Sequence, residues 1–206
     1  MSPDFSFESK LWNSGMQFVA GADEVGRGAF AGPVIAAVVI FAPFFKIETE
    51  INDSKKLTQK RREKVSVWIK EHAKNYAIGE GSVAEINDLG IVPATHLAFH
   101  RAINHLTLST DHYLIDAFYL PKINKSLQTP IIKGDSLSVS IAAASIIAKV
   151  YRDALMTKLS VENPPYKWHQ NKGYGTFAHR EALKNYGPTP HHRKHFIKKS
   201  LKKLKS

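Results

Sequence analysis

Two short apolar segments near the N-terminus constrain the fold of this chain more than any other feature. Residues 18–22 (FVAGA) end at Asp23 and Glu24, and residues 34–44 (VIAAVVIFAPF) are rich in β-branched and aromatic side chains. Short apolar runs of this kind are typical of buried strands. We therefore expect two neighbouring strands, joined by a loop that contains the sequence Gly-Arg-Gly.

Helix-like and strand-like segments alternate through the next part of the chain. Thr58 is a suitable N-cap for a helix at residues 59–74. The elements expected after it are a strand at residues 76–82, a helix at residues 83–106 interrupted at Gly90 and Pro93, strands at residues 113–115 and 130–133, and an alanine-rich helix at residues 138–159. This order predicts an α/β domain with a mixed sheet flanked by helices.

The composition changes after residue 160. Loops rich in Pro and Gly come first, followed by short predicted helices at residues 177–185 and from residue 194 onward. No repeat or low-complexity linker separates this part from the rest. We expect one domain at residues 16–206, with a core at residues 16–160 and a helical C-terminal extension at residues 161–206.

The charge balance points to a polyanionic partner. The 206 residues include 29 Lys and Arg against 18 Asp and Glu, a net charge of +11. Such an excess suits nucleic acid, although composition alone is equally consistent with a basic protein of another kind. The stretch at residues 191–206 has no acid, and it suits either a solvated helix face or phosphate contacts.

Some protein classes are excluded by what the sequence lacks. It has no cysteine, which rules out disulfides and thiolate metal sites. It has no apolar run of about 18 residues, and its N-terminus lacks the pattern of a secretory signal. We therefore expect a cytoplasmic protein with no membrane segment.

Four acids follow predicted strands, where metal ligands can gather. Asp23 and Glu24 end the first strand, Asp116 ends a later one, and Asp135 follows the next. Parallel strands present their carboxyl ends at one edge of a sheet, so these side chains can converge. Clustered carboxylates repel one another unless a cation neutralises them, and hard oxygen ligands suit Mg²⁺ or Mn²⁺. The pattern favours a two-metal site for phosphodiester hydrolysis.

These positions also allow other interpretations. Asp135 can simply cap the helix that follows it, and Asp53 lies in a polar loop, where we interpret it as a turn residue. His191, His192 and His195 have a spacing that could hold a transition metal, but their basic surroundings favour phosphate contact or solvation.

Seven segments, in order, closely resemble the type 2 ribonuclease H family, which in bacteria is called ribonuclease HII. They are GADEVGRGAFAGPV, NDSKKL, LIDAF, KGDS, AAASIIAKVYRD, HQNKGYGTFAH and HHRKHF, and they extend over nearly the whole chain. The resemblance implies a ribonuclease-H-like fold. It also implies metal-dependent cleavage of RNA in RNA–DNA hybrids, including single ribonucleotides embedded in duplex DNA.

The resemblance implies roles for individual residues. Four acids are implied to be catalytic and to bind two Mg²⁺ or Mn²⁺ ions: Asp23, Glu24, Asp116 and Asp135. Gly26, Arg27 and Gly28 are implied to recognise the ribose, and Tyr174 the junction with DNA. Glycine permits the close backbone approach to a sugar that such recognition needs.

Several further side chains are candidate contacts to the substrate backbone. These are Lys55, Lys56 and Lys149, with Ser145 four residues before Lys149 on the same helix face, and the C-terminal lysines. Contacts of this kind position a duplex without selecting a sequence. The expected partners are RNA–DNA hybrids and ribonucleotide-containing duplex DNA, bound by a monomer.

Two positions depart from the usual pattern of the family. Ala29-Phe30 stand where Pro-Leu is frequent, and Ala117-Phe118 stand where Gly-Asn is frequent. Neither change removes a metal ligand, but both affect loops of the expected site. The Gly-Arg-Gly sequence, in place of the Gly-Thr-Gly usual in type 3 enzymes, favours type 2.

Two other functions remain open at this point. One is a catalytically inactive, basic nucleic-acid-binding protein, which would be expected to lack at least one of the four acids. The other is a DNA nuclease or resolvase of the same fold. The Gly-Arg-Gly and Asn-Lys-Gly-Tyr-Gly-Thr sequences argue against the second, because the resemblance links them to ribose detection.

Overall fold

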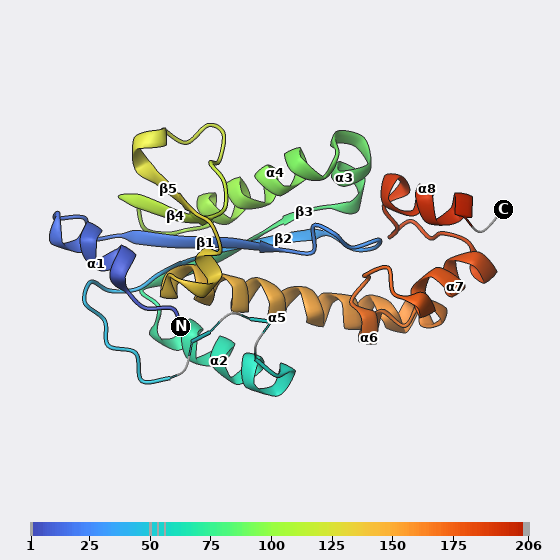
Figure 1. Cartoon of the computed structure of the whole chain (residues 1–206), viewed down its shortest axis with the longest axis horizontal. Helices are drawn as coiled ribbons and strands as arrows, with labels where there is room; N and C mark the ends of the chain where they lie inside the picture. Colours follow the sequence, from blue (N-terminus) through green and yellow to red (C-terminus); the bar gives the residue numbers. More distant parts are fainter. Residues whose placement is uncertain (1, 50, 53, 56, 204–206) are drawn as a thin grey trace.

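The centre of the molecule is a five-stranded sheet in the order β3-β2-β1-β4-β5 (Figure 1). The computed structural model describes residues 2–49, 51, 52, 54, 55 and 57–203. The strands are β1 (Val19–Val25), β2 (Val34–Ile40), β3 (Asn75–Gly81), β4 (His112–Asp116) and β5 (Gln128–Ile131). β1, β4 and β5 are parallel, whereas β2 runs antiparallel to both of its neighbours. The predicted mixed sheet is confirmed.

Helices cover both faces of this sheet (Figure 1). α3 (Val83–Leu89) and α4 (Ile91–Asn104) lie on one face, and α2 (Gln59–His72) and α5 (Val139–Glu162) lie on the other. Successive side chains of β2 therefore enter two different hydrophobic clusters, which explains why β2 is apolar at every position.

α5 packs closely against β1, the strand that carries the acidic pair. A Cβ atom added to Gly21 would lie 2.1 Å from the carbonyl carbon of Ser140, so only glycine permits this approach. The side chain of Ser138 caps α5 by accepting a hydrogen bond from the N–H of Ile141, at 3.2 Å. Side chains of α5 can therefore reach the acids of β1.

A short N-terminal helix, α1 (Ser6–Asn13), was not predicted. Its Trp12 is buried against the sheet, and its Glu8 is buried beside the start of α5. Glu8 accepts hydrogen bonds from the hydroxyl of Ser138 (2.6 Å) and the N–H of Ser140 (2.9 Å). A carboxylate at a helix N-terminus stabilises the unpaired N–H groups there.

The C-terminal part adds three helices that pack at the far end of α5 (Figure 1). They are α6 (Trp168–Asn171), α7 (Phe177–Tyr186) and α8 (Lys194–Lys203). Met156 of α5, Trp168, Leu183 and Ile197 form a shared hydrophobic cluster. The expected helical extension is thus present and packed on the core.

Two details of the expected elements were wrong. Only Gly90 breaks the helical segment, because Pro93 lies in the first turn of α4, where its missing N–H has no intrahelical partner to lose. The last strand, β5, begins at Gln128 and ends at Ile131, because the chain turns at Lys133 with a φ of 59°. Within the described residues, no helix combines the length and the apolar character needed to cross a bilayer.

Candidate active site

β1 and β4 bring three of the four predicted acids together at one edge of the sheet. Ala22 pairs with Ile115 in parallel register, so the next residues along the two strands, Asp23 and Asp116, are neighbours. Glu24 follows on β1. This is the convergence expected at the carboxyl ends of parallel strands.

Asp23 is the most enclosed of these acids, with 5% of its surface exposed. Burial raises the pKa of its carboxyl well above the ordinary value, and the charges of Glu24 and Asp116 raise it further. Hydrogen bonds from the hydroxyl of Ser145 and from the N–H of Glu24 (2.7 Å) lower the pKa in part. A divalent cation beside Asp23 would offset both the burial and the repulsion.

Glu24 has one oxygen engaged and one free of protein partners. Its Oε1 lies 3.1 Å from Nη1 of Arg27, whereas its Oε2 is buried and has no hydrogen-bond partner. Burial raises the pKa of the Glu24 carboxyl, and Arg27 acts against this shift. A buried, unpaired carboxylate oxygen fits a cation ligand, because such an oxygen is otherwise costly to bury.

Asp135 lies in a short 3₁₀ turn, η2 (Gly134–Ser136), directly after β5. Its Oδ2 lies 3.1 Å from Nζ of Lys55. The same turn is tied to β4, because the N–H of Gly134 donates to Oδ1 of Asp116 at 2.8 Å. Asp135 is therefore held at the same edge, with a lysine in contact with its carboxylate.

The acids are close but not assembled as a finished metal centre. Among the residues that the structure describes, no group of three carboxylate or imidazole side chains has the geometry of a preformed metal site. The oxygen chemistry of Asp23, Glu24, Asp116 and Asp135 nevertheless suits Mg²⁺ or Mn²⁺. Their assignment as ligands stays a prediction.

The Gly-Arg-Gly loop begins where β1 ends. Gly26 has a φ of 92°, and a Cβ there would lie 2.2 Å from Nε of Arg152, so this position requires glycine for two reasons. Gly28 is exposed, and a Cβ added to it would have no atom within 4 Å apart from its chain neighbours. The backbone beside Gly28 is therefore open to a ligand.

The departure at Ala117-Phe118 places an aromatic ring beside Arg27. The guanidinium carbon of Arg27 lies 5.6 Å from the ring centre of Phe118, within cation–π range. Phe118 and Arg27 also line a cavity of about 220 Å³ next to the loop. Ala117 adopts a φ of 67°, a left-handed conformation that a glycine adopts without strain.

The second departure, Phe30, joins the Gly-Arg-Gly loop to the loop that carries Tyr174. A Cβ on Gly175 would lie 2.4 Å from the ring of Phe30, so the ring packs directly on that backbone. The N–H groups of Phe30 and Ala31 both donate to the carbonyl oxygen of Gly173, at 2.8 and 3.2 Å. The two predicted substrate-recognition loops are thus neighbours.

Two buried arginines that we did not predict hold these loops. Arg152 donates to the carbonyl oxygens of Ala31, Pro33 and Lys172, and its guanidinium carbon lies 5.5 Å from the Tyr174 ring centre. Arg193 donates to the carbonyl oxygens of Gly32 and Arg27. The sequence feature that could have indicated Arg152 was the presence of an arginine within a mostly buried helix.

Burial lowers the pKa of Arg193 to about 9, and the nearby charge of Arg152 contributes. Its Nη2 atom is buried without a hydrogen-bond partner. Arg193 ties the C-terminal extension to this loop through the carbonyl oxygens of Arg27 and Gly32.

The histidines near the C-terminus do not form the alternative metal site. Nδ1 of His192 accepts a hydrogen bond from the N–H of Thr189 (2.9 Å), so its Nε2 carries the proton and faces Nε2 of His179 at 3.0 Å. Nδ1 of His179 then donates to the carbonyl oxygen of Tyr174 at 3.0 Å. His195 is exposed, and His191 packs against Trp168.

The predicted phosphate contacts have different surroundings. Lys55 is exposed beside Asp135, and Lys149 donates to Asp153 at 2.7 Å. Ser145 is buried, with its hydroxyl bound to Asp23 and 3.0 Å from that of Ser54, so it lies beside the acids and its contact with the substrate stays a prediction. Lys56 and Asp53 lie outside the described residues.

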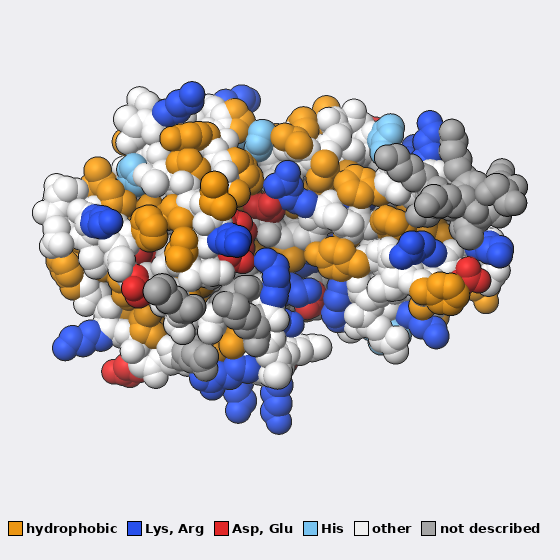
Figure 2. All heavy atoms as spheres, in the orientation of Figure 1, with side chains coloured by type: hydrophobic (Ala, Val, Ile, Leu, Met, Phe, Trp, Pro, Cys, Tyr) orange, Lys and Arg blue, Asp and Glu red, His pale blue; other side chains and the backbone are white. Residues whose placement is uncertain are grey.

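The surface around this site carries both signs of charge. Figure 2 shows Asp and Glu side chains near the middle of one face, with Lys and Arg side chains next to them. Such a surface can attract a polyanion while binding cations at its centre. The arrangement suits an enzyme that cleaves nucleic acid with divalent metal ions.

The sheet order and the acids at the ends of β1 and β4 define a ribonuclease-H-like fold. The solved ribonuclease H2 of Pyrococcus horikoshii OT3 superimposes with a TM-score of 0.70 at 24% identity, covering 92% of this chain and 99% of that one. The structure of Bst-RNase HIII in complex with Mn²⁺ gives a TM-score of 0.67 at 20% identity, covering 92% of this chain and 71% of that one.

Sequence comparison identifies the family. The family model described as Ribonuclease HII matches residues 20–200. A ribonuclease HII of Wolbachia sp. subsp. Brugia malayi is 50% identical over 94% of this chain and 93% of the relative. One of Clostridioides difficile is 47% identical over 95% of this chain and 76% of the relative. The chain belongs to the ribonuclease HII family, whose members are metal-dependent endoribonucleases.

Proposed function

We propose that this protein hydrolyses the RNA strand of RNA–DNA hybrids and cleaves on the 5′ side of ribonucleotides embedded in duplex DNA. The products are a 3′-hydroxyl and a 5′-phosphate. The proposal rests on one observation, which is that three parts of the predicted site lie next to one another. The acids at the ends of β1 and β4 continue directly into the Gly-Arg-Gly loop, which is hydrogen-bonded to the loop of Tyr174.

Each part has a distinct task in this proposal. Asp23, Glu24, Asp116 and Asp135 hold two divalent ions, Mg²⁺ or Mn²⁺. The chemistry that such ions would supply is activation of the attacking water and stabilisation of the leaving oxygen. The unpaired Oε2 of Glu24 and the raised pKa of Asp23 support this ligand assignment.

Recognition of the substrate falls to the two loops. The open backbone at Gly28 approaches the 2′-hydroxyl, which is both a donor and an acceptor, while Arg27 contacts a phosphate. Tyr174 offers its ring to the deoxyribose that follows the ribonucleotide. Lys55 and Lys149 contact the backbone. We further propose that the protein acts as a cytoplasmic monomer in ribonucleotide removal during replication and repair.

A duplex with one ribonucleotide in one strand tests the proposal. We expect one cut at the 5′ side of that ribonucleotide in Mg²⁺ or Mn²⁺, seen by end-mapping on a sequencing gel, and none in an all-DNA duplex. Absence of cleavage with both metals would leave the inactive nucleic-acid-binding protein as the better explanation. Cleavage of the all-DNA duplex would favour the DNA nuclease.

Asp23→Asn serves as the site control. The amide keeps the size of the side chain but removes the charge that binds metal, so we expect no detectable turnover. The folded state should persist, because the buried amide removes repulsion from Glu24 and Asp116. Near-normal cleavage by this variant would show that the site assignment is wrong.

A further inference from the structure

A stripe of polar side chains runs along α5, away from the acids. Ser145, Lys149, Asp153 and Thr157 are spaced four residues apart, so they share one face of the helix. Ser145 lies at the acidic end, bound to Asp23. The stripe therefore connects the candidate active site to the middle of α5.

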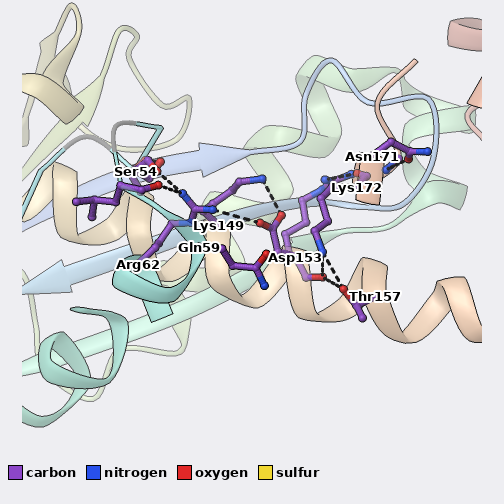
Figure 3. Close-up of polar contacts among 12 residues, drawn as sticks. Ser54, Gln59, Arg62, Lys149, Asp153, Thr157, Asn171 and Lys172 are labelled. Atoms are coloured by element: carbon purple, nitrogen blue, oxygen red, sulfur yellow. Dashed lines mark hydrogen bonds and ion pairs between the residues drawn. The ribbon is translucent and has the colours of Figure 1, made fainter. Parts of the chain in front are cut away.

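Asp153 is the centre of this stripe (Figure 3). It is 7% exposed, and its Oδ1 accepts a hydrogen bond from Nζ of Lys149 at 2.7 Å. Its Oδ2 lies 3.8 Å from Nη2 of Arg62, which comes from α2. One buried carboxylate thus fixes a lysine of α5 and an arginine of another helix.

Arg62 extends the same network into the loop before α2. Its Nη1 donates to the carbonyl oxygens of Ser54 and of Leu57, the latter at 2.9 Å. A planar guanidinium can hold two carbonyl groups while its other edge faces an acid, which a lysine cannot do. Arg62 and Asp153 therefore anchor this loop on α5.

The anchored loop contacts one predicted metal ligand directly and a second one through Ser145. The hydroxyl of Ser54 lies 3.0 Å from that of Ser145, which is hydrogen-bonded to Asp23. On the same loop, Lys55 contacts Asp135 at 3.1 Å. Displacement of the loop would affect the surroundings of both acids.

We infer that Asp153 and Arg62 are positioning residues that hold Lys149 and the loop of Ser54 and Lys55 for the phosphate backbone of the substrate. This rests on the proposed function, which makes Lys149 and Lys55 backbone contacts. A lysine held by a buried acid presents its remaining N–H bonds in a fixed direction, which reduces the conformational entropy lost when a phosphate binds.

The inference and simple electrostatics predict opposite changes in the affinity of Asp153→Asn for the duplex. Asp153→Asn removes a negative charge next to a polyanion, and charge alone would tighten binding. If Asp153 positions Lys149, the variant instead binds more weakly, by about tenfold, and its salt dependence becomes shallower by about one phosphate contact. Fluorescence anisotropy with a labelled single-ribonucleotide duplex in EDTA measures binding without turnover.

Glu63→Gln is the matched control. Glu63 is an exposed acid next to Arg62 on α2, and its charge acts on Lys172 in the same neighbourhood. The variant Glu63→Gln makes the same charge change without altering the Arg62–Asp153 pair. We therefore expect it to bind the duplex as tightly as the parent, or slightly more tightly. Equal or tighter binding by Asp153→Asn itself would overturn the inference.

Two further variants complete the test. Arg62→Lys keeps the charge but loses the contacts with two carbonyl oxygens, so it should also weaken binding of the duplex. If Asp153→Asn does not fold, Arg62→Lys alone tests the positioning role. Lys149→Met should weaken binding in the parent but have little effect in the Asp153→Asn background. Additive effects would contradict action through Lys149.

The proposed function and the positioning role of Asp153 and Arg62 can be contradicted independently. If the parent protein does not cleave the single-ribonucleotide duplex in Mg²⁺ or Mn²⁺, the proposed function fails. If the parent cleaves it but Asp153→Asn binds the duplex as tightly as the parent or more tightly, only the positioning role fails; Arg62→Lys takes the place of Asp153→Asn if the latter does not fold. Thermal unfolding of every variant confirms that binding is measured on folded protein.

Discussion

The ammonium group of Lys55 lies 3.1 Å from Oδ2 of Asp135, so a protein cation occupies a carboxylate oxygen of the fourth predicted metal ligand. The side chain of Lys55 is 77% exposed. Asp135 is buried, but water screens the pair from the exposed side of Lys55, so its contribution to stability is small. Lys55 can therefore move from Asp135 to a nearby phosphate with little loss of folding free energy.

Lys55→Met should separate metal binding from substrate binding. Removing a competing cation should strengthen binding of Mn²⁺ severalfold, while affinity for the duplex falls because one backbone contact is lost. Calorimetric titration with Mn²⁺ and anisotropy with the duplex measure the two effects. Lys64→Met makes the same charge change on the exposed side of α2. Unchanged or weaker Mn²⁺ binding relative to that control would contradict the prediction.

The ends of β1 and β4 could be predicted from the sequence because they depend on local patterns. An apolar run followed by an acid indicates a buried strand and its end, and parallel pairing brings such ends together. The networks of Arg152 and Asp153 could not be predicted this way. Apart from Lys149, which is four residues before Asp153, their partners lie far away in the chain. The same residues on a solvated helix face would have the same local sequence.

The departure at Ala117 should have a measurable effect on stability. A non-glycine residue at a φ of 67° is strained by about 1–2 kcal/mol. Ala117→Gly removes this strain but gives the unfolded chain more freedom, which offsets about 0.4–1 kcal/mol. We expect a net gain of about 0.5 kcal/mol and a melting temperature about 1–2 °C higher.

Ala154→Gly is the control for Ala117→Gly. Ala154 is an exposed residue inside α5. There, glycine should destabilise the protein by about 1 kcal/mol. Differential scanning calorimetry should therefore show shifts of opposite sign. A loss of stability in Ala117→Gly similar to that in Ala154→Gly would show that the backbone at residue 117 is not strained.

His192 should make the protein less stable in acid. The pKa of its imidazole is lowered from 6.5 to about 4, mainly by burial, with a contribution from the nearby charge of His179 and a smaller one from His191. The unfolded chain then binds more protons than the folded one between these pH values. The contribution of His192 is fully present above about pH 6.5 and is lost as the pH falls towards 4.

The measurement compares urea unfolding of the parent and of His192→Asn from pH 7 to pH 4.5. Glu8 has a raised pKa and acts in the opposite direction, so the prediction concerns the difference between the two proteins. His192→Asn should lose stability at pH 7, because it lacks the contacts with Thr189 and His179, and this deficit should shrink in acid. His195→Gln, at an exposed position, should follow the parent. A constant deficit at all pH values would contradict the prediction.

Tyr174 should matter for cleavage at a single ribonucleotide more than for folding. Its ring rests against Arg152, but Arg152 keeps its three carbonyl contacts when the ring is removed. Tyr174→Ala should therefore remain folded and lose the stacking surface offered to the substrate. Aromatic stacking on nucleic acid contributes about 1–3 kcal/mol, so we expect a fall of at least about fivefold in kcat/KM.

The control for Tyr174→Ala is Tyr186→Ala, a tyrosine of α7 that is 66% exposed. Tyr174→Phe separates the ring from the hydroxyl, and it should keep most of the activity if stacking is the main contribution. Kinetics on a single-ribonucleotide duplex and on a continuous RNA–DNA hybrid distinguish junction recognition from general binding, since the junction with DNA follows the ribonucleotide only in the first substrate. Equal losses on both substrates would assign Tyr174 to general binding, and unchanged kinetics on both would remove it from the site.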